Sequence, residues 1–180
     1  MNLVESEYMR RNSVWMPVAL VGALLAAAPA LAADNASAVL NDAQGKEVGT
    51  ATLATTPSGT LITLELTAAP PGAHAFHIHT TGKCEPPKFE SAGGHFNPDD
   101  SKHGFVNEGG PHAGDMPNIH VPDNGKFTVE VLNSLVNLSG ENALLDDDGA
   151  ALVIHGDGDD YKSDPAGHAG DRIACGVIQP

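Results

Sequence analysis

Nine histidines stand out in this chain of 180 residues, because they equal the number of Lys and Arg side chains together. Imidazole is the commonest metal ligand in proteins, so metal binding is the first chemistry to test. His77 and His79 are separated by one residue within an apolar stretch that has the pattern of a strand. Side chains at positions i and i+2 of a strand lie on one face, so both rings could reach one ion. Taken alone, such a pair more often occurs where no metal binds.

A second group of donors follows in a segment that is rich in Gly and Pro. Its members are His95, His103, His112 and Asp115. The short interval between His112 and Asp115 brings a nitrogen and a carboxylate together within one turn. Three His and one Asp suit a tetrahedral zinc site with no open position.

His155 ends the apolar stretch Leu152–Ile154 and would face a loop from the end of a strand. If His77, His79 and His95 converge with His155, a site made only of imidazoles results. Four nitrogen donors favour copper, which also has the highest affinity in the divalent series. The alternative for each histidine alone is a surface position or a hydrogen-bonded core position. It is much less credible that six of the nine histidines fit this arrangement by accident.

Strands must position these donors, because the apolar residues of the chain mostly alternate with a period of two. We predict about eight strands and no helix: Ala38–Leu40, Val48–Thr55, Thr60–Thr67, Ala73–His79, Asn118–Val121, Phe127–Leu132, Ala151–His155 and Arg172–Ile178. Turn residues at Pro57–Gly59 and Asp123–Gly125 predict two hairpins. The predicted fold class is all-β, an antiparallel sandwich or barrel.

Two long stretches, Thr80–Pro117 and Gly156–Asp171, fit no strand. Loops of this length are uncommon in compact domains and are usually functional or disordered. Metal ligands and a disulfide would order them. Cys84 and Cys175 are the only two cysteines, and in an oxidising compartment an even pair predicts a disulfide.

The N-terminal segment has the features of a secretory signal peptide. Two arginines precede an apolar run, Val14–Leu31, which ends in a small-x-small sequence at Ala32. We expect cleavage after Ala32, which removes residues 1–32 and leaves residues 33–180 as one domain. The alternative is a retained anchor, since about 18 residues nearly span a bilayer, but no basic stop-transfer cluster follows. We therefore expect export to the periplasm, or alternatively to the extracellular space, without stable membrane association after cleavage.

The charge balance excludes several classes of partner. Lys and Arg number 9 and Asp and Glu number 23, so the formal net charge is −14. A protein this acidic has no electrostatic footprint for DNA, RNA or anionic lipid. We therefore expect no nucleic-acid partner.

Three segments of the chain resemble copper-zinc superoxide dismutases, in particular the secreted bacterial type. They are Gly72–His79 (GAHAFHIH), Gly93–Pro98 (GGHFNP) and Gly170–Ile178 (GDRIACGVI). The resemblance implies an eight-stranded antiparallel Greek-key barrel with two long functional loops, and one Cu and one Zn per chain. It implies dismutation of superoxide to dioxygen and hydrogen peroxide by alternating reduction and oxidation of a His-ligated copper. The resemblance also makes a homodimer a possible assembly of this protein.

The resemblance carries over residue by residue. It implies that copper is held by His77, His79, His95 and His155, and zinc by His95, His103, His112 and Asp115, so that His95 bridges the two ions and takes part in catalysis. It further implies a carboxylate, Asp159, that links His77 to His103; a disulfide between Cys84 and Cys175; and a guanidinium, Arg172, that positions the anion beside the copper. The alternative function is that of a non-catalytic periplasmic copper/zinc-binding protein.

The three remaining histidines lie outside this set. We expect His74 to be a structural hydrogen-bond partner behind the metal-binding strand, and His120 and His168 to be surface groups. The loop Gly156–Asp171 carries one lysine, Lys162, against five aspartates. Electrostatic guidance of an anion by this loop should therefore be weaker, and the alternative is that lysines elsewhere in the chain supply it.

Overall fold

The computed structural model describes residues 34–180, so the predicted signal peptide lies outside the described residues. The described chain is all-β, as predicted, with one short 3-10 helix, η1 (Glu90–Ala92), that the sequence pattern did not predict. The strands are β1 (Asn35–Asp42), β2 (Glu47–Thr56), β3 (Gly59–Leu66), β4 (Gly72–His74), β5 (Phe76–His79), β6 (Ile119–Val121), β7 (Phe127–Asn133), β8 (Ala151–His155) and β9 (Arg172–Val177). Within this range no helix is long and apolar enough to cross a membrane.

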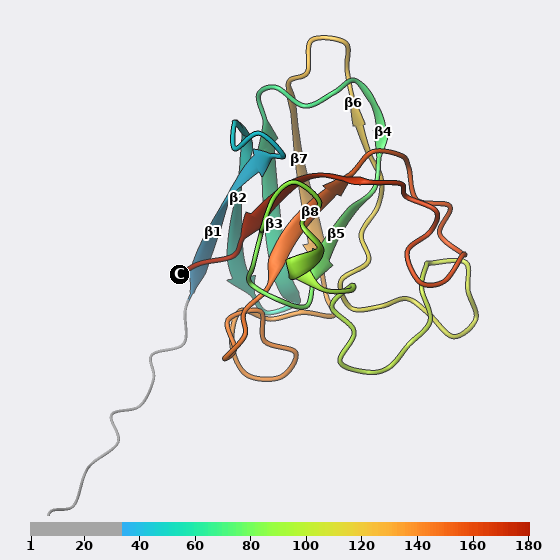
Figure 1. Cartoon of the computed structure of the whole chain (residues 1–180). Coiled ribbons are helices and arrows are strands. Elements are labelled where there is room, and N and C mark those ends of the chain that lie inside the picture. Colours follow the sequence, from blue (N-terminus) through green and yellow to red (C-terminus); the bar gives the residue numbers. More distant parts are fainter. Residues whose placement is uncertain (1–33) are drawn as a thin grey trace, which may run out of the picture. The chain divides into compact units, whose positions relative to one another are not determined.

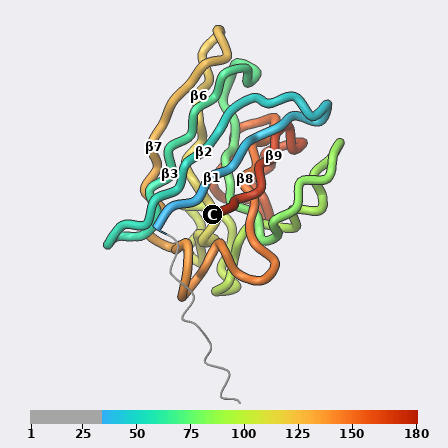
Figure 2. The backbone as a smooth tube through the Cα atoms, turned by 90° about the vertical axis from the view of Figure 1, so that its left-hand side faces the viewer, coloured from blue at the N-terminus to red at the C-terminus, as the bar shows by residue number. Residues whose placement is uncertain are grey.

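Seven of these strands form one antiparallel sheet in the order β5-β8-β9-β1-β2-β3-β7, and β4 pairs with β6 in a second, two-stranded sheet. Figure 1 shows the large sheet curling, with β4 and β6 beside its open side. In Figure 2 strands β1, β2, β3 and β7 run side by side. The neighbours β1 and β9, β5 and β8, and β3 and β7 are distant in sequence, which is typical of Greek-key connections. This topology confirms the predicted architecture.

The stretch Ala73–His79, predicted as one strand, is two strands that belong to different sheets. The break lies at Ala75, whose N–H donates to the carbonyl of Asp157 over 2.8 Å and whose carbonyl accepts from the N–H of His155 over 2.9 Å. At Ala75, these bonds to a loop and to the end of β8 take the place of the strand-to-strand hydrogen bonds that one continuous strand would make. The count of strands among the described residues is therefore nine where eight were predicted.

One predicted hairpin is confirmed and the other is wrong. Strand β3 pairs along its whole length with the part of β2 from Gly49 to Thr56, across the turn at Pro57–Ser58. A turn also joins β6 to β7, where the N–H of Gly125 donates to the carbonyl of Pro122 over 2.9 Å. However, β6 pairs with β4 and β7 pairs with β3. The seven residue pairs of the β3–β7 ladder hold β7 in the large sheet, so the two strands separate after the turn.

The core explains which strands carry the site. Strand β1 buries alternate residues, as expected of a sheet with one face to solvent. Strands β5 and β8 are instead buried at every position. A second apolar cluster, formed by Phe89, Ala92, Ala151, Val153 and Cys175, covers the outer face of β8. Side chains on these two strands are therefore held by packing on both sides.

The predicted disulfide is present. Cys84 and Cys175 are bonded across 91 positions of sequence, with their Cα atoms 5.6 Å apart. In the chain-entropy model, closing a loop of this size contributes about 4–5 kcal/mol to stability. The bond ties the start of the first long loop to the middle of β9.

Candidate metal centre

His77 and His79 lie on β5, and the structure confirms that the alternation of the strand directs both rings to one place. Both are buried, and β5 lies beside β8, whose last residue is His155. Isolated bridges join His79 to His95 and His77 to Asp115, which brings the first long loop against the strand. The donors from strand and loop thus meet inside the protein.

The structure brings together a first cluster of donors that consists only of imidazoles. One ring nitrogen from each of His77, His79, His95 and His155 lies within 4.8 Å of the others. The Nε2 atoms of His79 and His155 are 3.4 Å apart. Among the described residues, the only buried side-chain polar atoms without a hydrogen-bond partner are His77 Nδ1 and His95 Nε2. Leaving such atoms unpaired is costly, so their presence in one cluster fits a cation.

The other ring nitrogen of three of these histidines is already engaged. His77 Nε2 donates to Asp159 Oδ2 over 2.7 Å. His79 Nδ1 lies 3.0 Å from the carbonyl of Gly93, and His155 Nδ1 lies 3.4 Å from the carbonyl of Gly170. Such partners fix the tautomer and leave the opposite nitrogen free to bind a metal.

A second cluster combines three imidazoles with one carboxylate: His95, His103, His112 and Asp115. Asp115 Oδ1 lies 2.8 Å from His95 Nδ1, 3.1 Å from His103 Nδ1 and 3.3 Å from His112 Nδ1. Four ligand atoms at zinc distance in a tetrahedron are about 3.3 Å from one another. The spacing therefore fits one tetrahedral zinc ion with no free position.

His95 belongs to both clusters through different atoms. Its Nδ1 lies in the second cluster, 3.4 Å from His112 Nδ1, while its Nε2 is the unpartnered atom that belongs with the first. The predicted ligand sets thus converge as two buried sites joined by one ring.

Comparisons with known proteins agree with this geometry. A family model described as copper/zinc superoxide dismutase (SODC) matches residues 47–178. The chain belongs to the copper/zinc superoxide dismutase family. Superoxide dismutase (Cu-Zn) 1 of Aquifex aeolicus is 58% identical over 139 residues, covering 76% of this chain and 82% of that protein. Superoxide dismutase (Cu-Zn) 2 of the same organism is 54% identical over 164 residues, covering 89% and 96%.

Solved structures show the same fold. The crystal structure of a double mutant of a SOD-like protein from Bacillus subtilis has a TM-score of 0.76 and 39% identity, and covers 80% of this chain and 97% of that one. Copper/zinc superoxide dismutases bind one copper and one zinc, and the two clusters fit this pair.

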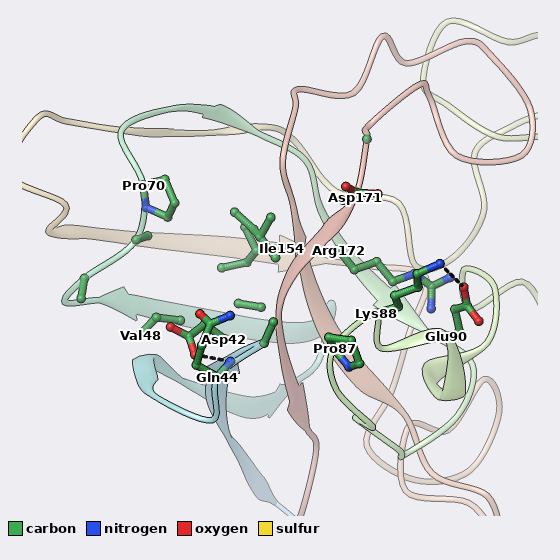
Figure 3. A pocket seen from close by; sticks show the side chains of 16 residues that line it. Asp42, Gln44, Val48, Pro70, Pro87, Lys88, Glu90, Ile154, Asp171 and Arg172 are labelled. Atoms are coloured by element: carbon green, nitrogen blue, oxygen red, sulfur yellow. Dashed lines mark hydrogen bonds and ion pairs between the residues drawn. The ribbon is translucent and has the colours of Figure 1, made fainter.

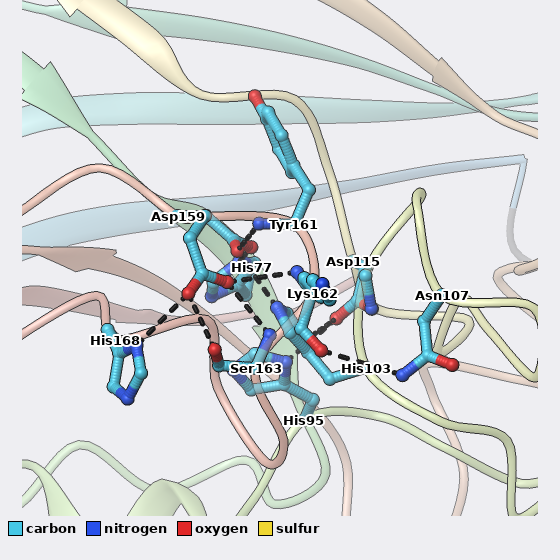
Figure 4. Close-up of polar contacts among 12 residues, drawn as sticks. His77, His95, His103, Asn107, Asp115, Asp159, Tyr161, Lys162, Ser163 and His168 are labelled. Carbon is cyan, nitrogen blue, oxygen red and sulfur yellow. Dashed lines mark hydrogen bonds and ion pairs between the residues drawn. The ribbon is translucent and has the colours of Figure 1, made fainter.

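Asp159 contacts one histidine of each cluster, and Figure 4 shows it close to His77 and His103. Its Oδ2 accepts from His77 and its Oδ1 accepts from His103 Nε2 over 2.9 Å. One carboxylate therefore orients a ring of each cluster, as expected from the family resemblance. Asn118 braces the main chain of Asp159, because its side-chain amide accepts from the N–H and donates to the carbonyl of Asp159.

The protonation states of two rings in the first cluster and of Asp115 suit a cation. Burial lowers the pKa of His77 to about 4 and that of His155 to about 3, so both rings are neutral donors at pH 7. Burial opposes the charge on Asp115, yet hydrogen bonds from His103, His95 and the N–H of Gly104 hold the pKa of this carboxyl well below its usual range. Neutral imidazoles and an ionised carboxylate are the protonation states that metal binding requires.

Arg172 is the first residue of β9 and is held by main-chain carbonyls. Its Nη1 donates to Phe89 and its Nη2 donates to Gly93, both over 2.6 Å. Figure 3 shows Arg172 at one end of a surface pocket of about 720 Å³, beside Lys88 and Glu90. None of the clustered histidines lines this pocket, so it is distinct from the metal centre. Lys88 and Glu90 form an exposed ion pair of 3.9 Å, which adds little stability.

The other histidines lie where the sequence predicts. His74 is buried, with Nδ1 2.8 Å from the carbonyl of His155 and Nε2 2.9 Å from that of Pro70. His120 and His168 are exposed. His168 also contacts Asp160 Oδ2 over 3.0 Å, a contact that the sequence did not predict.

Two residues that contact the site could not be found from the sequence. Gly167 has a φ of +64° and approaches so closely that a Cβ there would overlap Asp159 Oδ1. Tyr161 donates its N–H to the same carboxylate oxygen over 2.6 Å. Neither residue type is a metal ligand in such sites, and only the folded loop shows their contacts.

Proposed function

We propose that this protein is an exported superoxide dismutase that converts superoxide to dioxygen and hydrogen peroxide with one copper and one zinc per chain. The observation that carries the proposal is the sharing of His95 between two buried four-donor clusters. One cluster has only nitrogen donors and the other is a His₃Asp set, so the two sites suit different ions.

The ligand assignment follows from the free ring nitrogens. Copper would be held by His77 Nδ1, His79 Nε2, His95 Nε2 and His155 Nε2, and zinc by His95 Nδ1, His103 Nδ1, His112 Nδ1 and Asp115. When bound, copper supplies one-electron redox chemistry, whereas zinc has no accessible redox change and supplies charge and structure.

Arg172 attracts and orients the substrate in this proposal. The formal charge of −14 repels an anion at long range, but screening limits this to about 8 Å at physiological ionic strength. Two carbonyls hold this guanidinium in place, and one of them, that of Gly93, also contacts His79, so the guanidinium offers a fixed positive charge close to the site. A local field of this kind can speed association of a small anion.

His95 can hold a proton at a defined atom. Its Nε2 has no partner among the described residues and is buried, while its Nδ1 is engaged in the second cluster. A proton taken up at Nε2 and then passed to the reduced product would be one of the two protons that hydrogen peroxide needs. Asp159 keeps the neighbouring rings in the tautomers this arrangement needs.

The alternative, a non-catalytic periplasmic copper/zinc-binding protein, would use the same two clusters. Such a protein has no need for a guanidinium placed beside the site. The completeness of the all-imidazole cluster, together with Arg172, favours the enzyme.

Export belongs to the same proposal. The signal-like segment 1–32 and the disulfide together support the periplasm, with release from the membrane after cleavage at Ala32. Cell fractionation and N-terminal sequencing test both points. A homodimer remains a prediction, to be tested by the sedimentation of the purified protein.

Metal analysis combined with an assay of superoxide-driven dye reduction tests the function. We expect one Cu and one Zn per chain and cyanide-sensitive inhibition of dye reduction. His155→Ala should lose copper and activity, whereas His120→Ala, which changes an exposed histidine, should keep both. A fully loaded protein without activity would support the non-catalytic alternative.

A further inference from the structure

Tyr161 has an unusual backbone conformation close to the metal centre. Its φ is +61°, in the left-handed region that bulky residues rarely adopt. A residue remains in such a conformation only where its surroundings fix it, and such residues cluster at functional sites. It lies two positions after Asp159.

In this conformation the N–H of Tyr161 points at the carboxylate of Asp159. The N–H donates to Oδ1 over 2.6 Å, and His103 Nε2 donates to the same oxygen over 2.9 Å. The other oxygen, Oδ2, accepts from His77 Nε2 over 2.7 Å. Tyr161 therefore supplies a third donor that fixes the rotation of a carboxylate shared by both clusters.

The remaining groups of Tyr161 contact the first long loop and the segment before β6. Its carbonyl accepts from the N–H of Val106 over 3.1 Å, and its ring packs against Phe105 with centroids 5.4 Å apart. Its hydroxyl accepts from the N–H of Asn118 over 2.7 Å. Asn118 in turn braces the main chain of Asp159.

Gly104 connects these contacts to the zinc cluster. A Cβ on Gly104 would overlap the carbonyl of Tyr161, so the two main chains approach as closely as a glycine permits. The N–H of Gly104 donates to Asp115 Oδ2 over 2.8 Å. The segment Gly104–Val106 is thus held by Tyr161 on one side and holds Asp115 on the other.

We propose that Tyr161 is a positioning residue of the metal centre, which fixes the carboxylate of Asp159 and clamps Gly104–Val106 beside Asp115. This inference rests on the zinc ligand set of the proposed function and does not depend on dismutation. Loosening the clamp should free Asp159 and Asp115 together, and zinc should leave faster while the sheet stays folded.

The test compares Tyr161→Phe and Tyr161→Ala with the unmodified protein by the rate of zinc release to a colorimetric chelator. Tyr161→Phe keeps the ring and loses only the hydroxyl, so we expect release to be about 2- to 10-fold faster, as for one lost hydrogen bond. Tyr161→Ala also loses the ring, and we expect an increase of about 10- to 100-fold, in the range of changes next to ligands. Thermal unfolding of each metal-free variant shows that the fold is retained.

Two controls separate positioning from general destabilisation. Ile62→Val makes a small cavity on β3 and should change zinc release less than twofold. With cobalt in place of zinc, the visible spectrum reports ligand geometry; it should change in Tyr161→Ala and stay constant in Ile62→Val. Equal release from all variants, or equal acceleration by Ile62→Val, would overturn the role of Tyr161. Failure of the unmodified protein to bind zinc would instead overturn the ligand set.

Discussion

Arg172 and His79 donate to the same acceptor, the main-chain carbonyl of Gly93, over 2.6 and 3.0 Å. The shared carbonyl fixes the distance between a charged guanidinium and a ring of the all-imidazole cluster. Because Arg172 also donates to Phe89, its guanidinium is held by a segment that the disulfide at Cys84 anchors to β9.

Arg172→Ala should lower the rate at low superoxide concentration by about 10- to 100-fold, since it removes the fixed local charge that attracts the anion. Copper and zinc contents should stay near those of the unmodified protein, because Arg172 is not in either donor cluster. Stopped-flow superoxide decay and metal analysis on the same sample measure both quantities.

Lys88→Ala is the matched control for Arg172. Lys88 lines the same pocket, but its side chain is 78% exposed and pairs with Glu90. We expect less than a twofold change, and the difference between the variants should shrink as salt is raised. Unchanged turnover in Arg172→Ala would refute the assigned role.

Asp159→Asn should weaken zinc binding about 10- to 100-fold, as is usual when a partner of ligating histidines is removed. An amide offers one acceptor where the carboxylate offers two, so it cannot accept from both His77 and His103 as Asp159 does. Competition with a chelator measures the affinity. Asp123→Asn, an exposed change in the turn after β6, should leave zinc affinity unaltered, and an equal loss in both variants would contradict the role of Asp159.

Gly167→Ala and Gly45→Ala separate backbone strain from displacement of Asp159. Both glycines have positive φ, +64° and +78°, but a Cβ on Gly45 meets nothing within 4 Å. Each substitution should cost about 1–2 kcal/mol for the left-handed backbone. Only Gly167→Ala should also reduce zinc retention, because its methyl group would displace the carboxylate. Denaturant unfolding measures the loss of stability in each variant, and metal analysis measures its zinc content. A normal zinc content in Gly167→Ala would contradict the displacement of Asp159.

Zinc binding should release a proton from His103. In the metal-free protein burial opposes charge on this ring, but the hydrogen bonds and charges of Asp115 and Asp159 outweigh burial and raise the pKa of His103 to about 9. Zinc binds only the neutral ring. The deprotonation of His103 should therefore raise the apparent affinity for zinc about tenfold per pH unit up to about pH 9, above which the affinity should level off. His112 adds no proton at pH 7, since burial lowers its pKa.

Calorimetry in two buffers of different ionisation enthalpy measures this release. About one proton from His103 is expected at pH 7 and almost none at pH 10. A zinc affinity that does not change between pH 7 and 9 would show that His103 is neutral before zinc binds.

The sequence predicts the parts of the site that local periodicity controls. The His77–His79 pair follows from alternation in β5, and the turn at Pro57–Ser58 follows from local turn chemistry. It does not predict which strands pair, as β6 and β7 show: the turn between them forms, but β6 pairs with β4 and β7 pairs with β3, and both partners are distant in sequence. The division at Ala75 likewise depends on Asp157 and His155, about 80 positions away.

The convergence of the ligands could be predicted from residue types and the family resemblance, but the residues that orient them could not. Tyr161 acts through a positive φ and through contacts with Asn118, 43 positions earlier. Gly167 acts through the absence of a side chain. Such roles depend on how two loops pack, and no local pattern encodes that packing.

Anomalous diffraction from crystals of the metal-loaded protein, recorded on both sides of the copper and zinc absorption edges, tests the central claim most directly. We expect one copper peak among His77, His79, His95 and His155, and one zinc peak among His95, His103, His112 and Asp115, with His95 in contact with both. A single metal peak, two ions of one element after loading with both, or a His95 ring that contacts only one ion would contradict it.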